Sequence, residues 1–186
     1  INDKYGYEVG DKLLRETASR LKSISENAVL ARYEGDKFLI IAKAAKTEML
    51  VSLAPSALAV MCESFCIVAN EILLTASLGL AFFPHHGKNP MNILRRAEIA
   101  MYQAQRRGRG RLCVFSAEME EEAAQRVSMQ IALTQALDEE KLQVFYQPKI
   151  DVQRQCVIGC EALIRWQKED GSFIPPPAFI PLAEET

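Results

Sequence analysis

The chain has 186 residues, of which 49% are hydrophobic and 25% are charged, and its formal net charge is -2. A chain of this size and composition can fold as one globular domain with room for part of a second. A net charge this close to zero excludes a global field that attracts nucleic acid or an anionic membrane, so no nucleic-acid partner is expected.

No apolar run reaches the length of about 20 residues that a helix needs to span a bilayer. The longest run, Val51–Val60, is interrupted by two serines and a proline. We therefore expect a cytoplasmic protein, whose parent could still be anchored in a membrane through segments outside this chain. The chain begins at Ile1 without a methionine and ends at Thr186 just after a helical run starts, so we expect a piece of a longer polypeptide. No signal peptide is visible.

The cysteines do not indicate a secreted disulfide framework, because their number is odd and they are widely scattered. They are Cys62, Cys66, Cys113, Cys156 and Cys160. Two pairs have C-x-x-x-C spacing, whereas structural zinc sites more often use C-x-x-C, and no histidine lies near either pair. Buried, reduced thiols are the expected state, and a metal role is the alternative.

The first part of the chain alternates helical and β-like segments. Apolar residues at helical spacing over Leu13–Leu21 predict one face of a helix. Val29–Tyr33 and Lys37–Ala42 then predict a hairpin around the turn Glu34–Asp36.

A second helix and a strand follow. Thr47 is the predicted N-cap of a helix that runs to about Ser64. Pro55 removes a backbone donor inside this helix, so a break or kink is expected near Ala54. Ile72–Phe83 is rich in β-branched and aromatic residues and predicts a single strand.

A third helix is predicted to begin at Asn89–Pro90, an N-cap with proline at the first position, and to stop at Gly108. Leu112–Phe115 predicts a short strand. This alternation indicates an α/β (α+β) layer domain that ends near Ser116.

A connector helix is predicted over residues 117–140, which are dense in Glu, Ala, Gln and Leu. Ile131, Leu133 and Leu137 could face a neighbouring domain. One interpretation is a surface helix with a solvated charged face, and the other is a rigid arm that transmits domain motion. The sequence favours the first.

The remaining residues predict the start of another domain. Leu142–Ile150 and Cys156–Trp166 are β-like runs joined by a polar turn at Asp151–Gln155, and Asp170–Gly171 marks another turn. The chain becomes helical after Pro175.

Four separated motifs carry a family resemblance in the first domain. They are INDKYGYEVGD at Ile1–Asp11, EGDKF at Glu34–Phe38, the strand that begins at Ser77–Gly79, and AEIAMYQAQRRGRGR at Ala97–Arg111. In this order they resemble the GGDEF domains of diguanylate cyclases over residues 1–116. The resemblance implies a nucleotide-cyclase-like sheet with flanking helices, here lacking its first strand. It also implies GTP as a ligand and a homodimer, because such cyclases join two GTP molecules, one from each domain of a dimer, into cyclic di-GMP.

The resemblance assigns roles to four residues of this domain. Asn2 and Asp11 would hydrogen-bond the guanine edge, Arg109 would contact phosphate, and Asp36 would hold a metal ion. A plain surface hairpin is the alternative for the turn, but it does not explain the ordered motifs around it.

Three departures oppose cyclase chemistry. Lys37 stands where the family has a carboxylate near the reacting phosphate, Glu34 replaces the first glycine of the motif, and Gln105 replaces a triphosphate-binding lysine. Two unit charges about 4 Å apart interact by roughly 4 kcal/mol at an effective dielectric of 20, so a lysine strongly disfavours a metal ion there. We expect no cyclase activity, while residual GTP binding stays open.

The later motifs resemble the start of an EAL domain, which hydrolyses cyclic di-GMP. YQPKID at Tyr146–Asp151, EALIRW at Glu161–Trp166 and FIPLAEET at Phe179–Thr186 carry this resemblance. It implies the first strands of an incomplete TIM-like barrel over residues 141–186.

By this resemblance Glu161 is a metal ligand, Gln147 and Arg165 contact the dinucleotide, and Leu163 packs beside it. Mg²⁺ or Mn²⁺ would be the cofactor of the complete domain. The alternative for Glu161 is a strand carboxylate that pairs with Arg165. The predicted parent is a cyclic di-GMP phosphodiesterase with an inactive, GTP-sensing GGDEF domain, and the alternative is a non-catalytic cyclic di-GMP receptor or scaffold. No catalytic site is complete within this chain.

Overall fold

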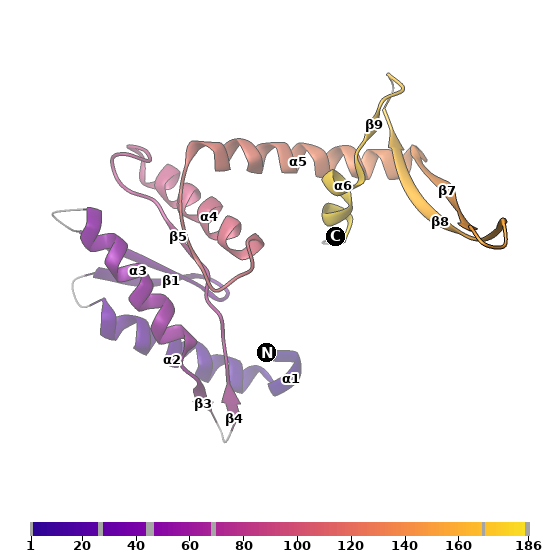
Figure 1. The fold of residues 1–186 in the computed structure, drawn as a ribbon. Helices are drawn as coiled ribbons and strands as arrows, with labels where there is room; N and C mark the ends of the chain where they lie inside the picture. The colour runs from indigo at the N-terminus through magenta and orange to yellow at the C-terminus, as the bar shows by residue number, and fades with distance from the viewer. Residues whose placement is uncertain (1, 26–27, 44–46, 68–69, 169, 185–186) are drawn as a thin grey trace. The chain divides into compact units, whose positions relative to one another are not determined.

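A computed structural model describes residues 2–25, 28–43, 47–67, 70–168 and 170–184 (Figure 1). The chain divides into two compact units, Ile1–Glu120 and Glu121–Thr186. Each unit mixes helices and strands, which confirms the predicted α/β class. No closed barrel is present among the described residues.

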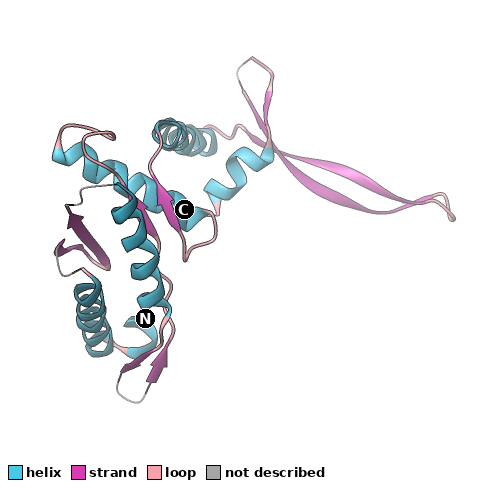
Figure 2. Cartoon of the chain, turned by 60° about the vertical axis from the view of Figure 1, so that its left-hand side comes forward, coloured by secondary structure: helices cyan, strands magenta, loops and turns pink. Residues whose placement is uncertain are grey.

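Figure 2 shows the helices and strands of the chain. Four helices lie wholly within the described residues of the first unit. They are α1 (Asn2–Tyr5), α2 (Tyr7–Ile24), α3 (Thr47–Cys62) and α4 (Pro90–Arg106). A fifth helix, α5 (Ala117–Asp138), begins in this unit and continues into the second.

The strands of the first unit form three two-stranded sheets among the described residues. β1 (Ala28–Glu34) pairs with β2 (Lys37–Ala42), and β3 (Phe65–Ile67) pairs with β4 (Asn70–Ile72), both antiparallel. β5 (Leu78–Leu80) and β6 (Leu112–Val114) pair in parallel.

The larger core cluster of this unit lies between α2, α3 and the short β3–β4 hairpin. Its buried members are Val9, Leu13, Leu21, Ala57, Met61, Phe65, Ile67 and Ile72. The helix predicted from the apolar spacing over Leu13–Leu21 is thus present and faces this core, as an amphipathic helix does.

The single strand expected in this region is wrong, and of the break or kink expected near Ala54 the break is absent. α3 runs without a break through Pro55, because burial of the neighbouring Ala54 and Ala57 holds the helix in place despite one lost hydrogen bond. The run Ile72–Phe83 is not one strand: Ile72 ends β4, and β5 takes a different partner in a separate sheet. The expected capping side chain at Thr47 lies outside the described residues.

Arg20 fixes the end of α3. Its guanidinium donates to the carbonyl oxygens of Val60, Glu63 and Ser64 at 3.1, 2.9 and 2.7 Å and lies 3.7 Å from the centre of the Phe65 ring. These carbonyls have no partner inside the helix, so the arginine satisfies them.

α4 starts as predicted and sits directly on β5. The Asn89 side chain accepts a hydrogen bond from the backbone N–H of Met91 at 2.9 Å, with Pro90 at the first helical position. A Cβ atom at Gly79 would lie 2.0 Å from the carbonyl oxygen of Ala97. Only glycine therefore allows this close approach of helix and strand.

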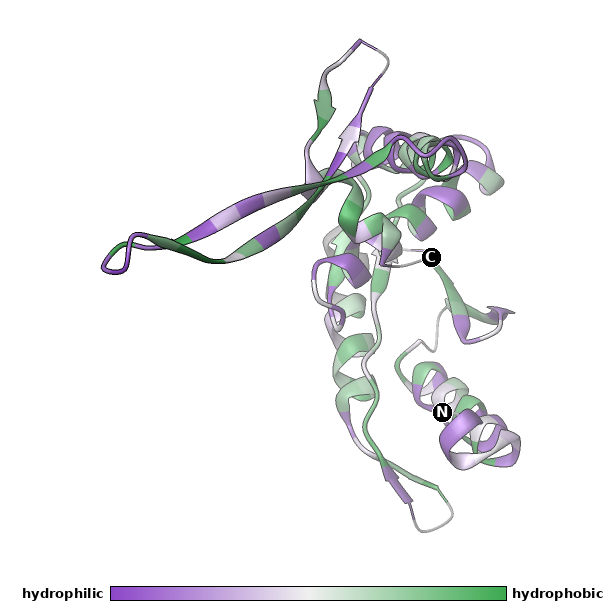
Figure 3. Cartoon of the chain, turned by 90° about the vertical axis from the view of Figure 1, so that its right-hand side faces the viewer, coloured by the Kyte–Doolittle hydropathy of each residue, from purple (hydrophilic) through white to green (hydrophobic). Residues whose placement is uncertain are grey.

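The second unit contains a long hairpin and a short helix. β7 (Leu142–Asp151) pairs antiparallel with β8 (Cys156–Gln167), and β8 pairs with β9 (Phe173–Ile174) before α6 (Pro176–Ala183). Figure 3 shows hydrophobic and hydrophilic bands along the hairpin. Most side chains of β7 and β8 are exposed on both faces.

The core of the second unit forms where α5 meets α6 and the end of β8. It comprises Leu133, Ala136, Trp166, Ile174, Phe179 and Leu182, and the rings of Trp166 and Phe179 meet edge to face at 5.3 Å. Of the α5 residues expected to face a neighbour, Leu133 is buried here, whereas Ile131 and Leu137 are more than half exposed.

The thiols differ from expectation. Cys113 is buried, but the other four cysteines are exposed, because they lie on outward-facing positions of α3, β3 and β8. Among the described helices, none combines the length and the apolar character that crossing a membrane requires.

Candidate functional site

The EGDKF segment forms the tight turn between β1 and β2. Glu34 and Lys37 are cross-strand partners, and Gly35 adopts a left-handed φ of 52° that favours glycine. The guanidinium of Arg32 donates to the carbonyl oxygen of Gly35 at 2.9 Å. We call Glu34–Lys37 the signature turn. Asp36 is exposed at its tip.

Lys37 is surrounded by groups of this unit that attract its charge. Its Nζ lies 3.0 Å from a carboxylate oxygen of Glu34, 3.7 Å from one of Glu98 on α4, and 5.6 Å from the centre of the Tyr102 ring. The hydrogen bond to Glu34 and then the contact with Tyr102 raise the pKa of Lys37 above its usual range. The ammonium therefore stays charged at every physiological pH.

Two departures from the family motif thus compensate each other. Glu34, which replaces a glycine, pairs with Lys37, which replaces a glutamate. The side chain of Lys37 is 26% exposed and that of Glu98 is 30% exposed, so this pair is less screened than an open surface pair. The site carries its own cation where a metal ion would need carboxylates.

The two predicted guanine-contacting residues lie next to each other on exposed parts of α1 and α2. The side-chain oxygen of Asn2 would lie 2.1 Å from a Cβ atom placed on Gly10, so the amide rests on the backbone just before Asp11. Both Asn2 and Asp11 are exposed. Their polar groups are therefore accessible to a base edge.

Arg109, the predicted phosphate contact, lies in the turn that follows α4. Arg109 is exposed in the turn after α4, with a φ of 57° between two glycines that also have positive φ. Among the described residues, no hydrogen bond or ion pair joins Arg109 to Asp36. The structure thus brings Asn2 and Asp11 together but does not connect Arg109 with Asp36.

The four residues predicted to serve the EAL site share one face of the β7–β8 hairpin. Gln147 lies directly opposite Glu161, and Phe145 lies opposite Leu163. Arg165 follows Leu163 by two residues, which places it on the same face because side chains alternate along a strand. One face of the hairpin therefore carries an exposed amide and carboxylate together with a half-buried apolar group and guanidinium.

Two contacts orient the charged groups on this face. A carboxylate oxygen of Glu161 lies 3.5 Å from Nζ of Lys149, and both side chains are more than half exposed. The guanidinium of Arg165 lies 5.9 Å from the centre of the Phe145 ring and donates to the carbonyl oxygen of Ile164. Glu161 pairs with Lys149 rather than with Arg165.

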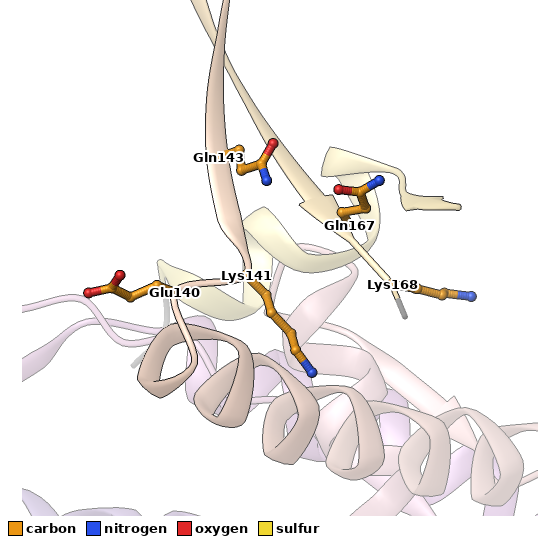
Figure 4. Close-up of a pocket in the computed structure, with 5 residues that line it drawn as sticks. All are labelled: Glu140, Lys141, Gln143, Gln167 and Lys168. Atoms are coloured by element: carbon orange, nitrogen blue, oxygen red, sulfur yellow. The ribbon is translucent and has the colours of Figure 1, made fainter. Parts of the chain in front are cut away.

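A shallow pocket of about 230 Å³ lies at the base of the hairpin (Figure 4). Its lining residues are Glu140, Lys141, Gln143, Gln167 and Lys168. It contains none of the four predicted EAL residues. In the described part of the chain, no group of three or more His, Cys, Asp or Glu side chains could hold a metal ion.

Family models match both parts of the chain. The diguanylate cyclase GGDEF domain matches residues 1–111. The chain belongs to the GGDEF family. The EAL domain matches residues 130–186, so this GGDEF chain continues into the beginning of an EAL domain.

Relatives with both domains span the whole chain. The cyclic di-GMP phosphodiesterase PdeR of Escherichia coli (strain K12) is 38% identical over 187 residues, which cover 100% of this chain and 28% of PdeR. The bifunctional diguanylate cyclase/cyclic di-GMP phosphodiesterase MucR of Pseudomonas aeruginosa is 33% identical and is covered over 27% of its length. The chain therefore spans less than a third of each of these relatives.

Solved GGDEF structures resemble the fold. An EAL/GGDEF domain protein from M. capsulatus has a TM-score of 0.59 at 36% identity, covering 62% of this chain and 76% of that one. The GGDEF domain of PA1120 from Pseudomonas aeruginosa has a TM-score of 0.64 at 27% identity, with 67% and 74% covered. The predicted family and fold are confirmed.

Three contributing residues did not emerge from the sequence. Glu98 and Tyr102 hold Lys37, and both fall within the helix motif of the GGDEF resemblance, which was the available signal. Lys149 contacts Glu161 and lies inside the YQPKID motif. Pairing across the turn or between strands cannot be read from either motif alone.

Proposed function

We propose that this chain is part of a cyclic di-GMP phosphodiesterase whose GGDEF domain makes no cyclic di-GMP. The observation that carries the proposal is the shared face of the β7–β8 hairpin, on which Gln147, Glu161, Leu163 and Arg165 meet. The name of the relative PdeR, a cyclic di-GMP phosphodiesterase, supports it. In domain terms we assign residues 1–116 to the GGDEF domain, 117–140 to the connector helix and 141–186 to the EAL domain.

The proposed reaction is hydrolysis of one phosphodiester bond. A water oxygen forms a bond to phosphorus, the bond from phosphorus to the 3′-oxygen breaks, and the linear dinucleotide leaves with a proton on that oxygen. Arg165 would bind a phosphate oxygen, Gln147 would hydrogen-bond the dinucleotide, and Leu163 would pack against it. These contacts bind and orient the substrate.

Mg²⁺ or Mn²⁺, when bound, would lower the pKa of the attacking water and neutralise the developing charge. Glu161 suits such an ion, because hard divalent cations prefer carboxylate oxygen and this carboxylate is exposed. One carboxylate does not make a site, so the remaining ligands would come from the rest of the EAL domain.

The GGDEF domain has a different proposed role. Lys37 would repel the divalent cations that accompany GTP turnover, which opposes cyclase activity. Asn2 and Asp11 stay exposed, which leaves base recognition available. We propose that GTP binds there without being consumed, in a domain that can form a homodimer. Because GTP and cyclic di-GMP are nucleotides of the cytoplasm, both domains would face it.

A non-catalytic cyclic di-GMP receptor is the second candidate, and the Lys149–Glu161 pair favours it. Lysine already neutralises the carboxylate that would hold a metal ion. A receptor needs only the binding face, without turnover.

Turnover by the full-length protein separates the two candidates. With cyclic di-GMP and Mn²⁺ we expect linear dinucleotide, and Glu161→Ala should lower kcat by about a thousandfold, because a metal ligand contributes several kcal/mol to the barrier. The matched control is Glu139→Ala, which removes another exposed carboxylate paired with a lysine and should leave kcat unchanged. Tight binding of cyclic di-GMP without any linear product would support the receptor instead.

A further inference from the structure

α4 contacts the signature turn on one side and the first turn of the connector helix on another. Glu98 and Tyr102, one helical turn apart, hold Lys37 of the signature turn. Arg96 lies two residues before Glu98, which turns its side chain by about 200° to the opposite side of the helix. Both sets of contacts lie within the first unit.

The second set of contacts forms a charged clasp on Glu120 of α5. Arg96 donates from Nε and Nη2 to one carboxylate oxygen of Glu120 at 3.1 and 3.0 Å. Nη2 of Arg95 lies 3.3 Å from the other oxygen. The carboxylate is also in the first turn of α5, where the helix dipole favours a negative charge.

The clasp is anchored to the rest of the unit. Nη1 of Arg96 donates to the carbonyl oxygen of His86 at 2.7 Å, and its guanidinium lies 5.2 Å from the centre of the Phe115 ring. The side chains of Arg96 and Glu120 are both 29% exposed, so the clasp is better shielded than the outer contact made by Arg95. A shift of Arg96 would therefore move or release Glu120 at the start of α5.

α4 itself cannot absorb such a shift easily. Gly79 lets the helix backbone sit against β5 without a side chain between them. Close-packed elements of this kind move as units rather than deforming locally.

We propose that α4 couples the signature turn to the start of the connector helix. When Lys37 leaves Glu98, α4 readjusts, and the Arg96–Glu120 clasp loosens at the first turn of α5. A polyanion at the signature turn, such as a nucleoside triphosphate, would compete with Glu98 for Lys37. This proposal rests on the proposed function in one respect only, which is that the ligand at the signature turn is GTP.

Hydrogen exchange in the full-length protein tests the coupling without any ligand. Glu98→Gln should speed exchange of the amides in the second turn of α5, the first that donate within the helix, by about fivefold, the lower end for coupled sites. Because coupling is reciprocal, Glu120→Gln should speed exchange at the β1–β2 turn by a similar factor. Glu121→Gln is the control for removing a charge beside Glu120, and Glu121 is exposed. The β3–β4 hairpin should not respond to any of the three.

The proposal is overturned if Glu98→Gln changes exchange only around the signature turn and Glu120→Gln changes it only at the start of α5. Adding GTP to the unaltered protein should reproduce the effect of Glu98→Gln at α5. If calorimetry shows no GTP binding, the proposed GTP-sensing function is wrong. Exchange in Glu98→Gln and Glu120→Gln still tests the coupling, because neither measurement needs GTP.

Discussion

The β1–β2 and β7–β8 hairpins both present acidic residues that the family resemblances associate with divalent cations, yet they treat charge differently. At the signature turn, Lys37 lies between Glu34 and Glu98 and is 26% exposed. On the β7–β8 hairpin, Glu161 is more than half exposed and has one lysine at 3.5 Å. In the first site a partly buried lysine lies between two carboxylates, whereas in the second one exposed lysine contacts one exposed carboxylate.

This difference shows why a recognisable motif is not the same as a working site. Gly35 and the Arg32 hydrogen bond hold the backbone of the signature turn, although Lys37 reverses one charge of the family motif. The β7–β8 hairpin keeps its chemical groups on one face.

The largest effect on stability is expected from substituting a glycine in β5, with a glycine in β8 as the comparison. Gly79→Ala would place a Cβ atom 2.0 Å from the Ala97 carbonyl oxygen and 2.3 Å from the Met101 nitrogen, both backbone atoms. We expect the free energy of unfolding of the first unit to fall by about 3 kcal/mol, the cost of strong overpacking. Thermal unfolding monitored with a probe in each unit would measure it.

Gly159→Ala on β8 is the matched control. Nothing lies within 4 Å of a Cβ atom at Gly159, so unfolding should change by less than about 1 kcal/mol. Equal losses from the two substitutions would mean that α4 is not packed against β5 as described.

Lys37→Glu tests whether the first site is closed by its own cation. The substitution leaves Glu34, Asp36 and Glu98 beside a new carboxylate, with no positive charge among them. We expect Tm to fall without metal and to recover by about 4 °C in Mn²⁺ at tenfold over its Kd. Lys37→Gln should show no such recovery. If Mn²⁺ also raised the Tm of the first unit in the unaltered protein, Lys37 would not exclude a metal ion from this site.

The smallest expected effect is a pH dependence confined to the first unit, since both histidines lie there. Burial lowers the pKa of His86 below its ordinary value of 6.5, helped by the charges of His85 and Arg96. Its Nδ1 also accepts a hydrogen bond from the Phe82 N–H at 3.0 Å, which protonation would remove.

A lowered pKa in the folded state means that the unfolded state takes up protons more readily. The stability that neutral His86 provides is present above pH 6.5 and is lost as pH falls from there through the lowered pKa. His86→Asn keeps an acceptor for Phe82 and should flatten this dependence in equilibrium unfolding. An unchanged slope in that variant would assign the titration to other groups.

Much of the local structure could be predicted from the sequence. The start of α4 at Asn89 and Pro90 and the two long hairpins followed from local signals. The continuity of α3 through Pro55 could not be predicted, because burial overrode the local preference.

The site was predictable in its residues but not in its pairings. Lys37 was visible as a reversed charge, whereas its contact with Glu98 depends on how α4 packs beside the hairpin. The shared face of Gln147 and Glu161 follows from strand register, which motif spacing alone does not determine.

The most direct test of the contrast between the hairpins is one assay of both reactions in the full-length protein with Mn²⁺. Cyclic di-GMP should yield linear dinucleotide, and GTP alone should yield no cyclic di-GMP. Synthesis of cyclic di-GMP from GTP would contradict the conclusion that Lys37 closes the first site.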